Sequence, residues 1–542
     1  MSPDLPTLDR QRMQAEIATD NRFDAVVIGG GITGAGTFRD LALQGLRVLL
    51  VERDDFASGA SGALTRIAHG GFRYLERGDV GLVRESVIER DLLIANAPHV
   101  IRPVRVVLPL RTRLGGLLAA PFRFLKLMPG RGMPGVVPMT IGVRLYDALA
   151  GRKRALARGG AAMGSKTQRL FPYLGESFAG AIWTQEGRIH APERIAIELL
   201  EDGVAASGRS VALNYCRLVG ADGGTLTLED GLSGATLTVE AGVVVNAGGA
   251  HADKVAALFG ITERMTGGVA GIHVILESAS IAKALQDDLL FFEDHHADPA
   301  KRRLCVLYRL AGNRLLLGTT EFACDDPDEA TIRPTDEDYL LQALDAALPG
   351  HGVTKADITG RIVGVRPLIR SKTADLTSRS RSHAVISHET KGLTLITIIG
   401  GKWTTFRRMA EDATDAVLAE LGRPRTVSTT HLAIGGGRDF RRADTVRDLI
   451  ADGLDAALAE RLADTYGSRA KRVAEWIRGE GAEPISADGR LTQGEIAFFA
   501  AAELAATAED IVRRRCDQFF RGNDIETLMS QVAAELARLK HP

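Results

Sequence analysis

The clearest hydrophobic pattern lies near the start of the chain, where the apolar run 25–28 predicts a strand that is buried on both faces. Residues 33–43 have helical composition, and a second apolar run at 47–51 completes a strand, helix, strand unit. The turn between the first strand and the helix reads Gly-Gly-Gly-Ile-Thr-Gly, and Glu52 closes the second strand. This order predicts a parallel sheet that begins with a dinucleotide-binding unit.

Three glycines of this turn occupy positions where a side chain would obstruct the backbone or the ligand. Gly29 permits the tight turn, Gly31 lets backbone approach a pyrophosphate, and Gly34 lets helix and strand pack closely. The pyrophosphate would lie at the positive end of the helix, against unsatisfied N–H groups. Glu52 follows about eighteen residues later, where a carboxylate hydrogen-bonds a ribose hydroxyl and argues against a 2′-phosphate. The alternative, a merely tight loop, leaves the order of these features unexplained.

The rest of the chain alternates between strand-like and helical patterns. Between 204 and 240, strand-like runs are separated by Gly-rich turns, which is typical of an antiparallel meander. Short apolar strands at 243–245 and 393–399 are each followed by a Gly-Gly turn, which predicts that the chain leaves the first sheet and returns to it. From Thr404 onward the spacing is helical, and the connection 421–438 introduces a separate helical domain.

These patterns predict an α/β fold with three parts. They are a discontinuous Rossmann-like FAD-binding domain, an antiparallel β-rich substrate domain that includes the strand-rich stretch 271–330, and a C-terminal α-helical domain. The expected boundaries are 20–110, 196–262 and 361–420 for the FAD-binding domain, 111–195 and 263–360 for the substrate domain, and 436–542 for the helical domain.

Composition narrows the class of protein. The 542 residues include 67 basic and 68 acidic side chains, and this balance argues against a nucleic acid partner. Four scattered cysteines without C-x-x-C spacing predict neither a disulfide framework nor a metal site. The first twenty residues have no apolar signal core, and no run reaches about eighteen apolar residues. We therefore expect a cytoplasmic protein, soluble or peripheral on the inner face of the cytoplasmic membrane.

The stretch 111–159 differs from its surroundings. It holds ten Lys or Arg residues and a single acid, Asp147, interleaved with leucines, Phe122, Phe124 and Met128. A cationic and apolar segment of this kind suits an anionic membrane surface. It also suits an Arg-rich cap over a substrate domain, and the sequence leaves both interpretations open.

Two segments concentrate chemically useful side chains. In the first, 65–76, paired glycines beside His69 let backbone and imidazole approach a flat ring, while Arg73 and Tyr74 supply donors for a phosphate or carboxylate. Such a segment read alone is more often a structural turn. The second concentration of cations comprises 364–372, 378–383 and 400–408. Each of its arginines alone predicts a solvated charge, but together around a Gly-Gly turn they indicate an anion site beside a cofactor.

The motifs GGGITGAG, HGGFRYLE, GVRPL and GGKWTTFR, with LGTTE at 317–321 and TYGS at 465–468, are collinear with those of a known family. The chain resembles the FAD-dependent glycerol-3-phosphate dehydrogenases over nearly its whole length. This resemblance implies FAD as cofactor. It also implies oxidation of sn-glycerol 3-phosphate, or a close polyol phosphate, to the ketose phosphate by hydride transfer to flavin, with a quinone as electron acceptor.

The resemblance also assigns roles by matched motif. His69 would be the general base, since hydride removal from a carbinol carbon also requires loss of the hydroxyl proton. Arg366 and Lys402 join it as catalytic residues. Substrate oxygens and phosphate would be held by Arg73, Tyr74, Arg366, Arg381 and Lys402. The expected cofactor-binding residues are Gly29, Gly31, Gly34, Glu52, Ser61, Thr65, His69, Gly70, Gly248, Gly401 and Thr404.

Four positions depart from the family pattern, and all fall around the predicted substrate domain. The chain has Tyr308-Arg309 for Pro-Trp, Gly249-Ala250-His251 for Gly-Pro-Trp, Ala270 for Lys in Lys-Gly-x-His, and Glu321 for Asp after the GTT motif. The flavin signature is intact.

Three other functions compete with this interpretation. An oxidase would pass electrons to oxygen, and a non-catalytic flavin-binding regulator would have lost turnover. A nicotinamide dehydrogenase would explain the N-terminal glycines and leave HGGFRYLE and GGKWTTFR without a purpose. A homodimer and a peripheral membrane contact are candidate associations.

Overall fold

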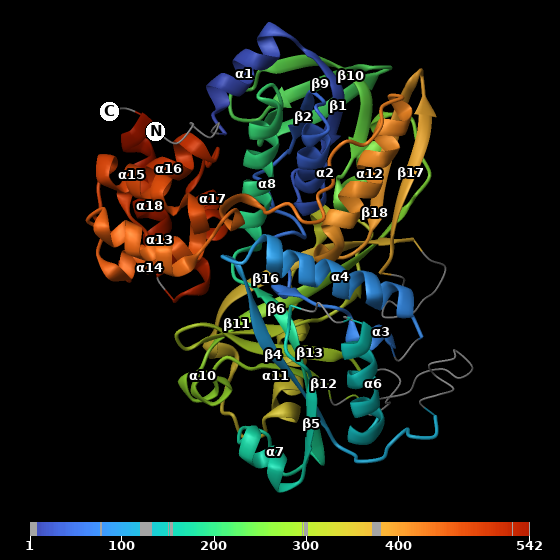
Figure 1. Cartoon of the computed structure of the whole chain (residues 1–542), viewed down its shortest axis with the longest axis vertical. Helices are drawn as coiled ribbons and strands as arrows, with labels where there is room; N and C mark the ends of the chain where they lie inside the picture. Colours follow the sequence, from blue (N-terminus) through green and yellow to red (C-terminus); the bar gives the residue numbers. More distant parts are fainter. Residues whose placement is uncertain are drawn as a thin grey trace.

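The chain folds into two sheet-based layers and a helical body, as a computed structural model shows (Figure 1). Phe122, Phe124 and Met128 of the cationic stretch lie outside the described residues, and only the backbone of Arg73 is described. The described residues are 8–75, 78–119, 133–149, 151, 155–294, 296, 302–370, 381–522 and 524–540.

The first sheet has eight strands in the order β17-β18-β10-β1-β2-β7, with β8 and β9 attached to β10. Its central strands run parallel, and Ala25 of β1 lies between Val48 of β2 and Val243 of β10. These central strands are apolar because both faces are covered. The strands are β1 (Arg22–Ile28), β2 (Val48–Val51), β7 (Val211–Leu213), β8 (Cys216–Asp222), β9 (Thr225–Asp230), β10 (Thr236–Asn246), β17 (His383–Thr390) and β18 (Leu393–Gly400).

Three helices cover one face of this sheet. Figure 1 shows α8 (Pro192–Ser207), α2 (Ile32–Leu43) and α12 (Phe406–Glu420) side by side in front of its strands. The buried side chains Phe38 and Phe406 belong to the core between helices and sheet. The predicted glycine unit, the antiparallel meander and the returning strands β10 and β18 are all present in this layer.

The second sheet has ten strands in the order β15-β11-β14-β13-β12-β4-β6-β3, with β16 paired to β11 and β5 to β6. Its pairings are antiparallel except for β12 with β4. The strands are β3 (Ile67–Ala68), β4 (Ile101–Leu110), β5 (Gly160–Met163), β6 (Gly180–Ile189), β11 (Thr266–Glu277), β12 (Leu289–Glu293), β13 (Leu304–Ala311), β14 (Arg314–Gly318), β15 (Phe322–Ala323) and β16 (Ile358–Ile369).

Three strands in stretches that the sequence analysis assigned to the FAD-binding domain lie in the second sheet: β3, β4 and β16. Strand β4 pairs with β6 along its whole length, and β16 pairs with β11 from Thr266 to Leu276. Their backbone hydrogen bonds therefore belong to the substrate layer. Composition does not mark these crossings, because sheet membership is decided by partners far along the chain.

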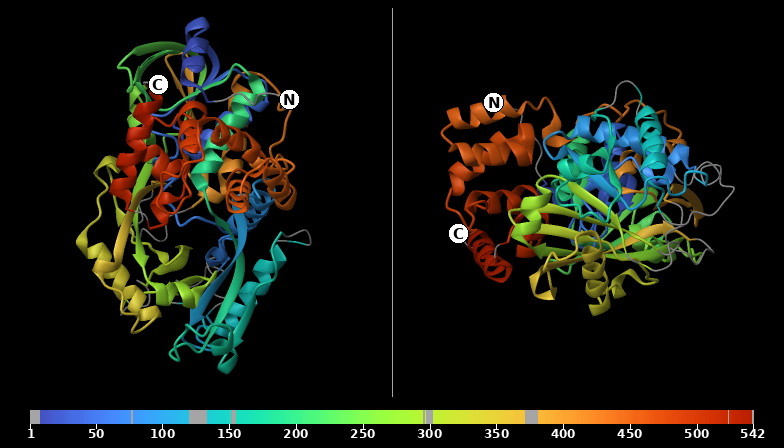
Figure 2. Two further views of the ribbon diagram at one scale, coloured as in Figure 1. Left: turned by 90° about the vertical axis from the view of Figure 1, so that its left-hand side faces the viewer. Right: turned by 90° about the horizontal axis from the view of Figure 1, so that it is seen from below.

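The C-terminal helices form a separate body with its own core. The right-hand view of Figure 2 shows it to one side of both sheets. Leu462, Phe499 and Val532 are buried inside it. Its helices are α13 (Arg442–Ala451), α14 (Ala456–Tyr466), α15 (Ala470–Glu480), α16 (Gln493–Ala502), α17 (Ala508–Asp510) and α18 (Ile525–Lys540). With the two sheets, this body confirms the predicted fold class.

The remaining helices frame the sheets. In the part of the chain that the structure describes, no helix is both long and apolar enough to span a bilayer. All four cysteines are free thiols. The helices are α1 (Arg10–Thr19), α3 (Phe72–Leu75), α4 (Val80–Asn96), α6 (Val136–Leu149), α7 (Ser165–Leu170), α9 (Ala252–Leu258), α10 (Ala279–Leu285) and α11 (Pro334–Ala347).

Candidate functional site

The glycine turn between β1 and α2 forms a cradle at the end of the first sheet. Gly29 has a φ of 111°, and a Cβ there would lie 2.5 Å from the carbonyl oxygen of Ala247. A Cβ on Gly34 would lie 1.9 Å from the carbonyl oxygen of Gly29, so helix and strand meet through backbone atoms. A Cβ on Gly31 would lie 3.1 Å from Ser61 Oγ. The turn therefore tolerates no side chain at Gly29 or Gly34.

A carboxylate and a helix N-terminus border this cradle. Glu52 accepts hydrogen bonds from the N–H groups of Gly30 (2.7 Å) and Asp54 (3.0 Å), and burial raises the pKa of its carboxyl group. At the start of α2, Ser61 Oγ accepts from the N–H of Ile32 (2.9 Å). The positive helix end suits a pyrophosphate and Glu52 suits a ribose hydroxyl, so this cradle fits a dinucleotide.

Three other predicted cofactor residues lie near the ends of strands. The backbone nitrogen of Gly248 would lie 3.1 Å from a Cβ on Gly29. Gly401, with a φ of 82°, follows β18, which is the neighbour of β10. Thr65 precedes β3 in the second sheet, and its Oγ1 lies 3.1 Å from Nε2 of His273. The predicted cofactor set therefore spans both layers.

The two predicted motifs around His69 and Lys402 meet in space. The backbone N–H of His69 donates to Thr404 Oγ1 at 3.3 Å, although 335 positions separate these residues. Lys402 Nζ lies 4.8 Å from the ring centroid of Tyr74 and donates to Ser86 Oγ. The base His69, the cation Lys402 and the phenol Tyr74 therefore lie together beside the turn that follows β18.

The imidazole of His69 is held in its neutral form. Burial, followed by the positive charges of Lys402, Arg381 and Arg90, lowers its pKa to about 3. A neutral imidazole keeps a lone pair that can accept a proton. This side chain is therefore available as a proton acceptor at physiological pH.

The ammonium group of Lys402 has a pKa close to neutral pH. Burial and the charge of Arg381 lower its pKa to about 8, while Glu85 and Glu186 oppose that shift. The group therefore remains mostly protonated at pH 7 and can stabilise negative charge on a nearby oxygen.

Two arginines converge on a single carboxylate oxygen. Arg366 donates to Glu321 Oε1 at 2.7 Å, and Arg381 donates to the same oxygen at 3.3 Å. A second nitrogen of Arg366 donates to Thr319 Oγ1 at 3.4 Å. A Cβ on Gly271 would lie 2.9 Å from Arg366, so this glycine makes room for the guanidinium. The result is a preformed anion site between β11, β16 and the end of β14.

The charge of Arg381 connects the anion site to His69, because it lowers the pKa of both His69 and Arg366. Burial is the largest cause of the lowered pKa of Arg366. Arg73 precedes Tyr74 on the short helix α3. His69, Lys402 and the arginines therefore form one electrostatically coupled site.

Sequence reasoning missed a buried network behind His69. Glu186 Oε2 accepts from the N–H of Gly70 and from Arg90, both at 3.0 Å. Tyr146 donates to Glu186 Oε1 at 2.7 Å, and a Cβ on Gly70 would lie 2.1 Å from its hydroxyl. This network fixes the backbone beside the imidazole. No spacing could reveal it, since its members come from α4, α6 and β6.

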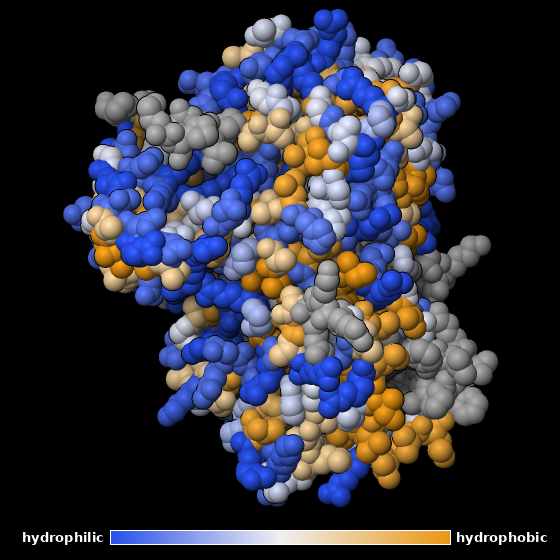
Figure 3. Space-filling view, viewed as in Figure 1, coloured by the Kyte–Doolittle hydropathy of each residue, from blue (hydrophilic) through white to orange (hydrophobic). Residues whose placement is uncertain are grey.

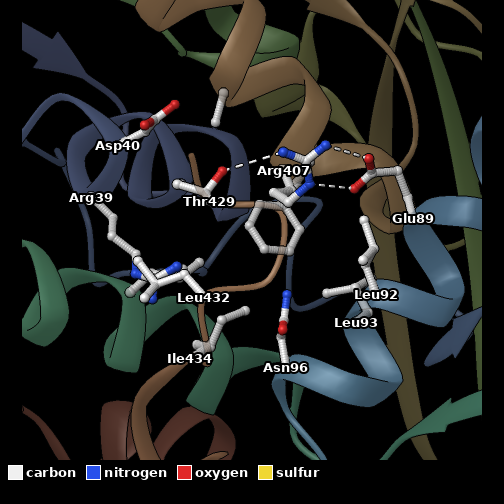
Figure 4. A pocket seen from close by; sticks show the side chains of 14 residues that line it. Arg39, Asp40, Glu89, Leu92, Leu93, Asn96, Arg407, Thr429, Leu432 and Ile434 are labelled. Atoms are coloured by element: carbon white, nitrogen blue, oxygen red, sulfur yellow. Dashed lines mark hydrogen bonds and ion pairs between the residues drawn. The ribbon is translucent and has the colours of Figure 1, made fainter. Parts of the chain in front are cut away.

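A small cavity between α2, α4 and α12 lies apart from these groups (Figure 4). Figure 4 shows Arg407 between Glu89, to which it donates at 2.6 and 2.9 Å, and Thr429. The volume of about 20 Å³ accommodates about one water molecule. It is a packing defect beside an ion pair rather than a substrate site.

Among the described residues, no group of three or more His, Cys, Asp or Glu side chains could hold a metal ion.

Comparisons with known proteins identify the family of the chain. The family described as FAD dependent oxidoreductase matches residues 24–407, and the C-terminal domain of alpha-glycerophosphate oxidase matches residues 427–541. A glycerol-3-phosphate dehydrogenase of Synechocystis sp. is 30% identical, with 91% of this chain and 88% of that protein covered. The mitochondrial glycerol-3-phosphate dehydrogenase of Macaca fascicularis is also 30% identical, over 93% of this chain and 69% of that protein.

A solved structure shares the fold. The glycerol-3-phosphate dehydrogenase from Bacillus halodurans, complexed with FAD, superposes with a TM-score of 0.71 at 24% identity, over 98% of this chain and 94% of that one. The fold and the matched residues define an FAD-dependent oxidoreductase. The chain belongs to the glycerol-3-phosphate dehydrogenase family within that class. Family membership confirms the predicted resemblance, the enzyme class and the FAD cofactor.

Proposed function

We propose that the protein oxidises sn-glycerol 3-phosphate, or a close polyol phosphate, to dihydroxyacetone phosphate or the matching ketose phosphate. The observation that carries this proposal is the coupling of a neutral imidazole at His69 to the arginine pair Arg366 and Arg381. A phosphorylated secondary alcohol has one group for each: a hydroxyl for the base and a phosphate for the arginines.

The residues of the site divide the work of the reaction. His69 accepts the hydroxyl proton, and Lys402 stabilises the negative charge that develops on the alcohol oxygen. Arg366 and Arg381, together with Tyr74 and the predicted Arg73, bind the phosphate and orient the carbinol carbon. FAD would be held by the cradle of Gly29, Gly31, Gly34 and Glu52 and would supply the two-electron acceptor chemistry. Positioning by the arginines lowers the entropic part of the barrier.

We further propose that the protein works at the inner face of the cytoplasmic membrane and passes its electrons to a quinone. Support comes from apolar side chains around α6 and the preceding segment, where Figure 3 shows hydrophobic residues gathered at the lower right. Arg113 and Arg144 lie on the same two segments, and a cationic, apolar surface suits anionic lipid. The exposed side chains are Leu114, Leu117, Leu118, Ile141 and Leu145.

The membrane proposal has a direct test. Substitution of Leu118, which is 85% exposed, and Ile141, which is 63% exposed, by Ser should reduce flotation with anionic vesicles. The same pair of changes should leave oxidation of soluble substrate unchanged. Undiminished flotation would contradict the membrane proposal.

A homodimer stays a prediction, which light scattering after gel filtration checks.

Anaerobic reduction of the flavin tests the proposed reaction. Addition of sn-glycerol 3-phosphate or a four-carbon analogue to the purified holoenzyme should bleach the oxidised flavin spectrum. Glycerol without phosphate should have little effect at equal concentration, because it lacks the group that the arginines bind. Electron transfer to oxygen is the competing route, and stoichiometric peroxide under air would favour it over a quinone.

A further inference from the structure

Glu321 is the carboxylate that both arginines of the anion site contact. It follows β14 and precedes β15, and its side chain is only 12% exposed. A single oxygen, Oε1, accepts from both Arg366 and Arg381. The backbone carbonyl of Glu321 also accepts from Arg303 at 2.9 Å, which fixes the segment while the carboxylate faces the guanidinium pair.

Two half-buried guanidiniums that share one acceptor repel one another, and the charge of Arg381 adds to the effect of burial in lowering the pKa of Arg366. A carboxylate between them compensates part of this charge. Carboxylate and phosphate oxygens accept from guanidinium groups in the same geometry. The oxygen of Glu321 therefore stands where a phosphate oxygen would accept the same hydrogen bonds.

We propose that Glu321 is an internal competitor for the substrate phosphate and sets the affinity of the anion site. This inference rests on the proposed function, in which Arg366 and Arg381 bind the phosphate. A phosphate that binds both arginines must displace the carboxylate from them, and its binding free energy is reduced by the interactions that it replaces. The chain has Glu at a position where the family pattern has Asp, and the added methylene extends the reach of the carboxylate toward both guanidiniums.

The decisive variant is Glu321→Gln, which keeps the shape of the side chain and removes its charge. We expect the Kd of the holoenzyme for inorganic phosphate, measured by calorimetry at low ionic strength, to fall about tenfold. The KM for sn-glycerol 3-phosphate should fall with it, because the substrate phosphate no longer displaces a charged carboxylate from the arginines. Salt should weaken phosphate binding more steeply in the variant.

A matched control is Glu329→Gln, an exposed carboxylate further along the chain, in the connection between β15 and α11. It removes the same charge at a distance from the guanidiniums, so the Kd for phosphate should stay within about twofold of the wild type. If Glu321→Gln fails to fold, Glu321→Asp serves instead, since it retains the charge and shortens the reach. That variant should give a smaller decrease in Kd.

An unchanged or increased Kd for phosphate in a folded Glu321 variant would overturn the proposal, because it would make Glu321 a support that holds the arginines in place. The proposed function fails separately. If phosphate binding tightens in the variant but no polyol phosphate reduces the wild-type flavin, the competitor remains and the proposed substrate is wrong. If sn-glycerol 3-phosphate reduces the wild-type flavin but Glu321→Gln leaves the Kd for phosphate unchanged, the proposed function stands and the competitor role of Glu321 is wrong.

Discussion

At the scale of single residues, the imidazole of His69 has a pKa lowered to about 3 by burial and three neighbouring cations. His69→Ala should retain FAD and lose about 100- to 10,000-fold in kcat, because general-base catalysis contributes in that range. Single-turnover flavin reduction measures the loss. The control is His431→Ala, at an exposed position of the connection before the helical body, which should behave as wild type. A His69 variant with wild-type turnover would exclude the base.

Lys402 sets the predicted pH dependence. Its pKa is lowered to about 8, so the protonated form is present below that pH and lost above it. If the ammonium stabilises the alkoxide, kcat/KM should fall above about pH 8, where the free enzyme loses this proton while the substrate phosphate, with a second pKa of about 6, is already a dianion. His69 adds no acidic limb near neutral pH because its pKa lies far below.

Lys402→Arg provides the comparison, since a guanidinium stays charged throughout the accessible pH range. The variant should lose the alkaline limb, at a lower maximum rate because the geometry of the cation differs. An alkaline limb that persists unchanged in the variant would assign the titration to another group.

At the scale of elements, the glycine turn has the tightest packing near the cofactor cradle. Gly34→Ala would place a Cβ 1.9 Å from the carbonyl oxygen of Gly29, so β1 and α2 must separate. We expect a loss of about 1–3 kcal/mol in the free energy of unfolding and a clear drop in FAD content. Differential scanning calorimetry and the ratio of flavin to protein absorbance measure the two effects.

Gly59→Ala is the matched control, since a Cβ there meets nothing within 4 Å. It lies in the segment before Ser61, which binds the start of α2. This variant should bind FAD as the wild type does. Equal behaviour of the two alanine variants would contradict the assignment of the turn as a close backbone contact.

The sequence predicted some elements much better than others. The strands at 25–28 and 393–399 and the helix at 33–43 were predicted to within a few residues, because their hydrophobic pattern and glycines act locally. The sequence did not show that β3, β4 and β16 pair within the second sheet, because sheet membership depends on partners far along the chain. For the same reason, motifs indicated His69 and Lys402 but not the supporting Glu186.

At the scale of the whole molecule, buried ion pairs join the helical body to the first sheet. Asp55, three residues after Glu52, accepts from Arg515 at 2.8 and 2.9 Å and from Arg514 at 2.6 Å. Arg194 of α8 donates to Glu503 at 3.1 Å. The segment that carries the predicted ribose-binding carboxylate is therefore held by the C-terminal body.

Arg515→Met should leave the buried Asp55 without one of its partners. We expect a loss of about 3–5 kcal/mol in the free energy of unfolding, and weaker FAD binding, because the segment after Glu52 is no longer fixed. Arg447→Ala, a 69% exposed arginine in the same helical body, should cost less than about 0.5 kcal/mol. Chemical denaturation and FAD titration compare them. A stable Arg515 variant with full FAD affinity would show that the two bodies act independently.

The central claim is that the coupled site removes a hydride from the carbinol carbon of a phosphorylated alcohol. The most direct measurement is anaerobic stopped-flow reduction of the flavin by sn-glycerol 3-phosphate, with hydrogen or deuterium on that carbon. We predict full bleaching and a slower reduction by the deuterated substrate. A flavin that stays oxidised in saturating sn-glycerol 3-phosphate and in every four-carbon analogue would contradict the account.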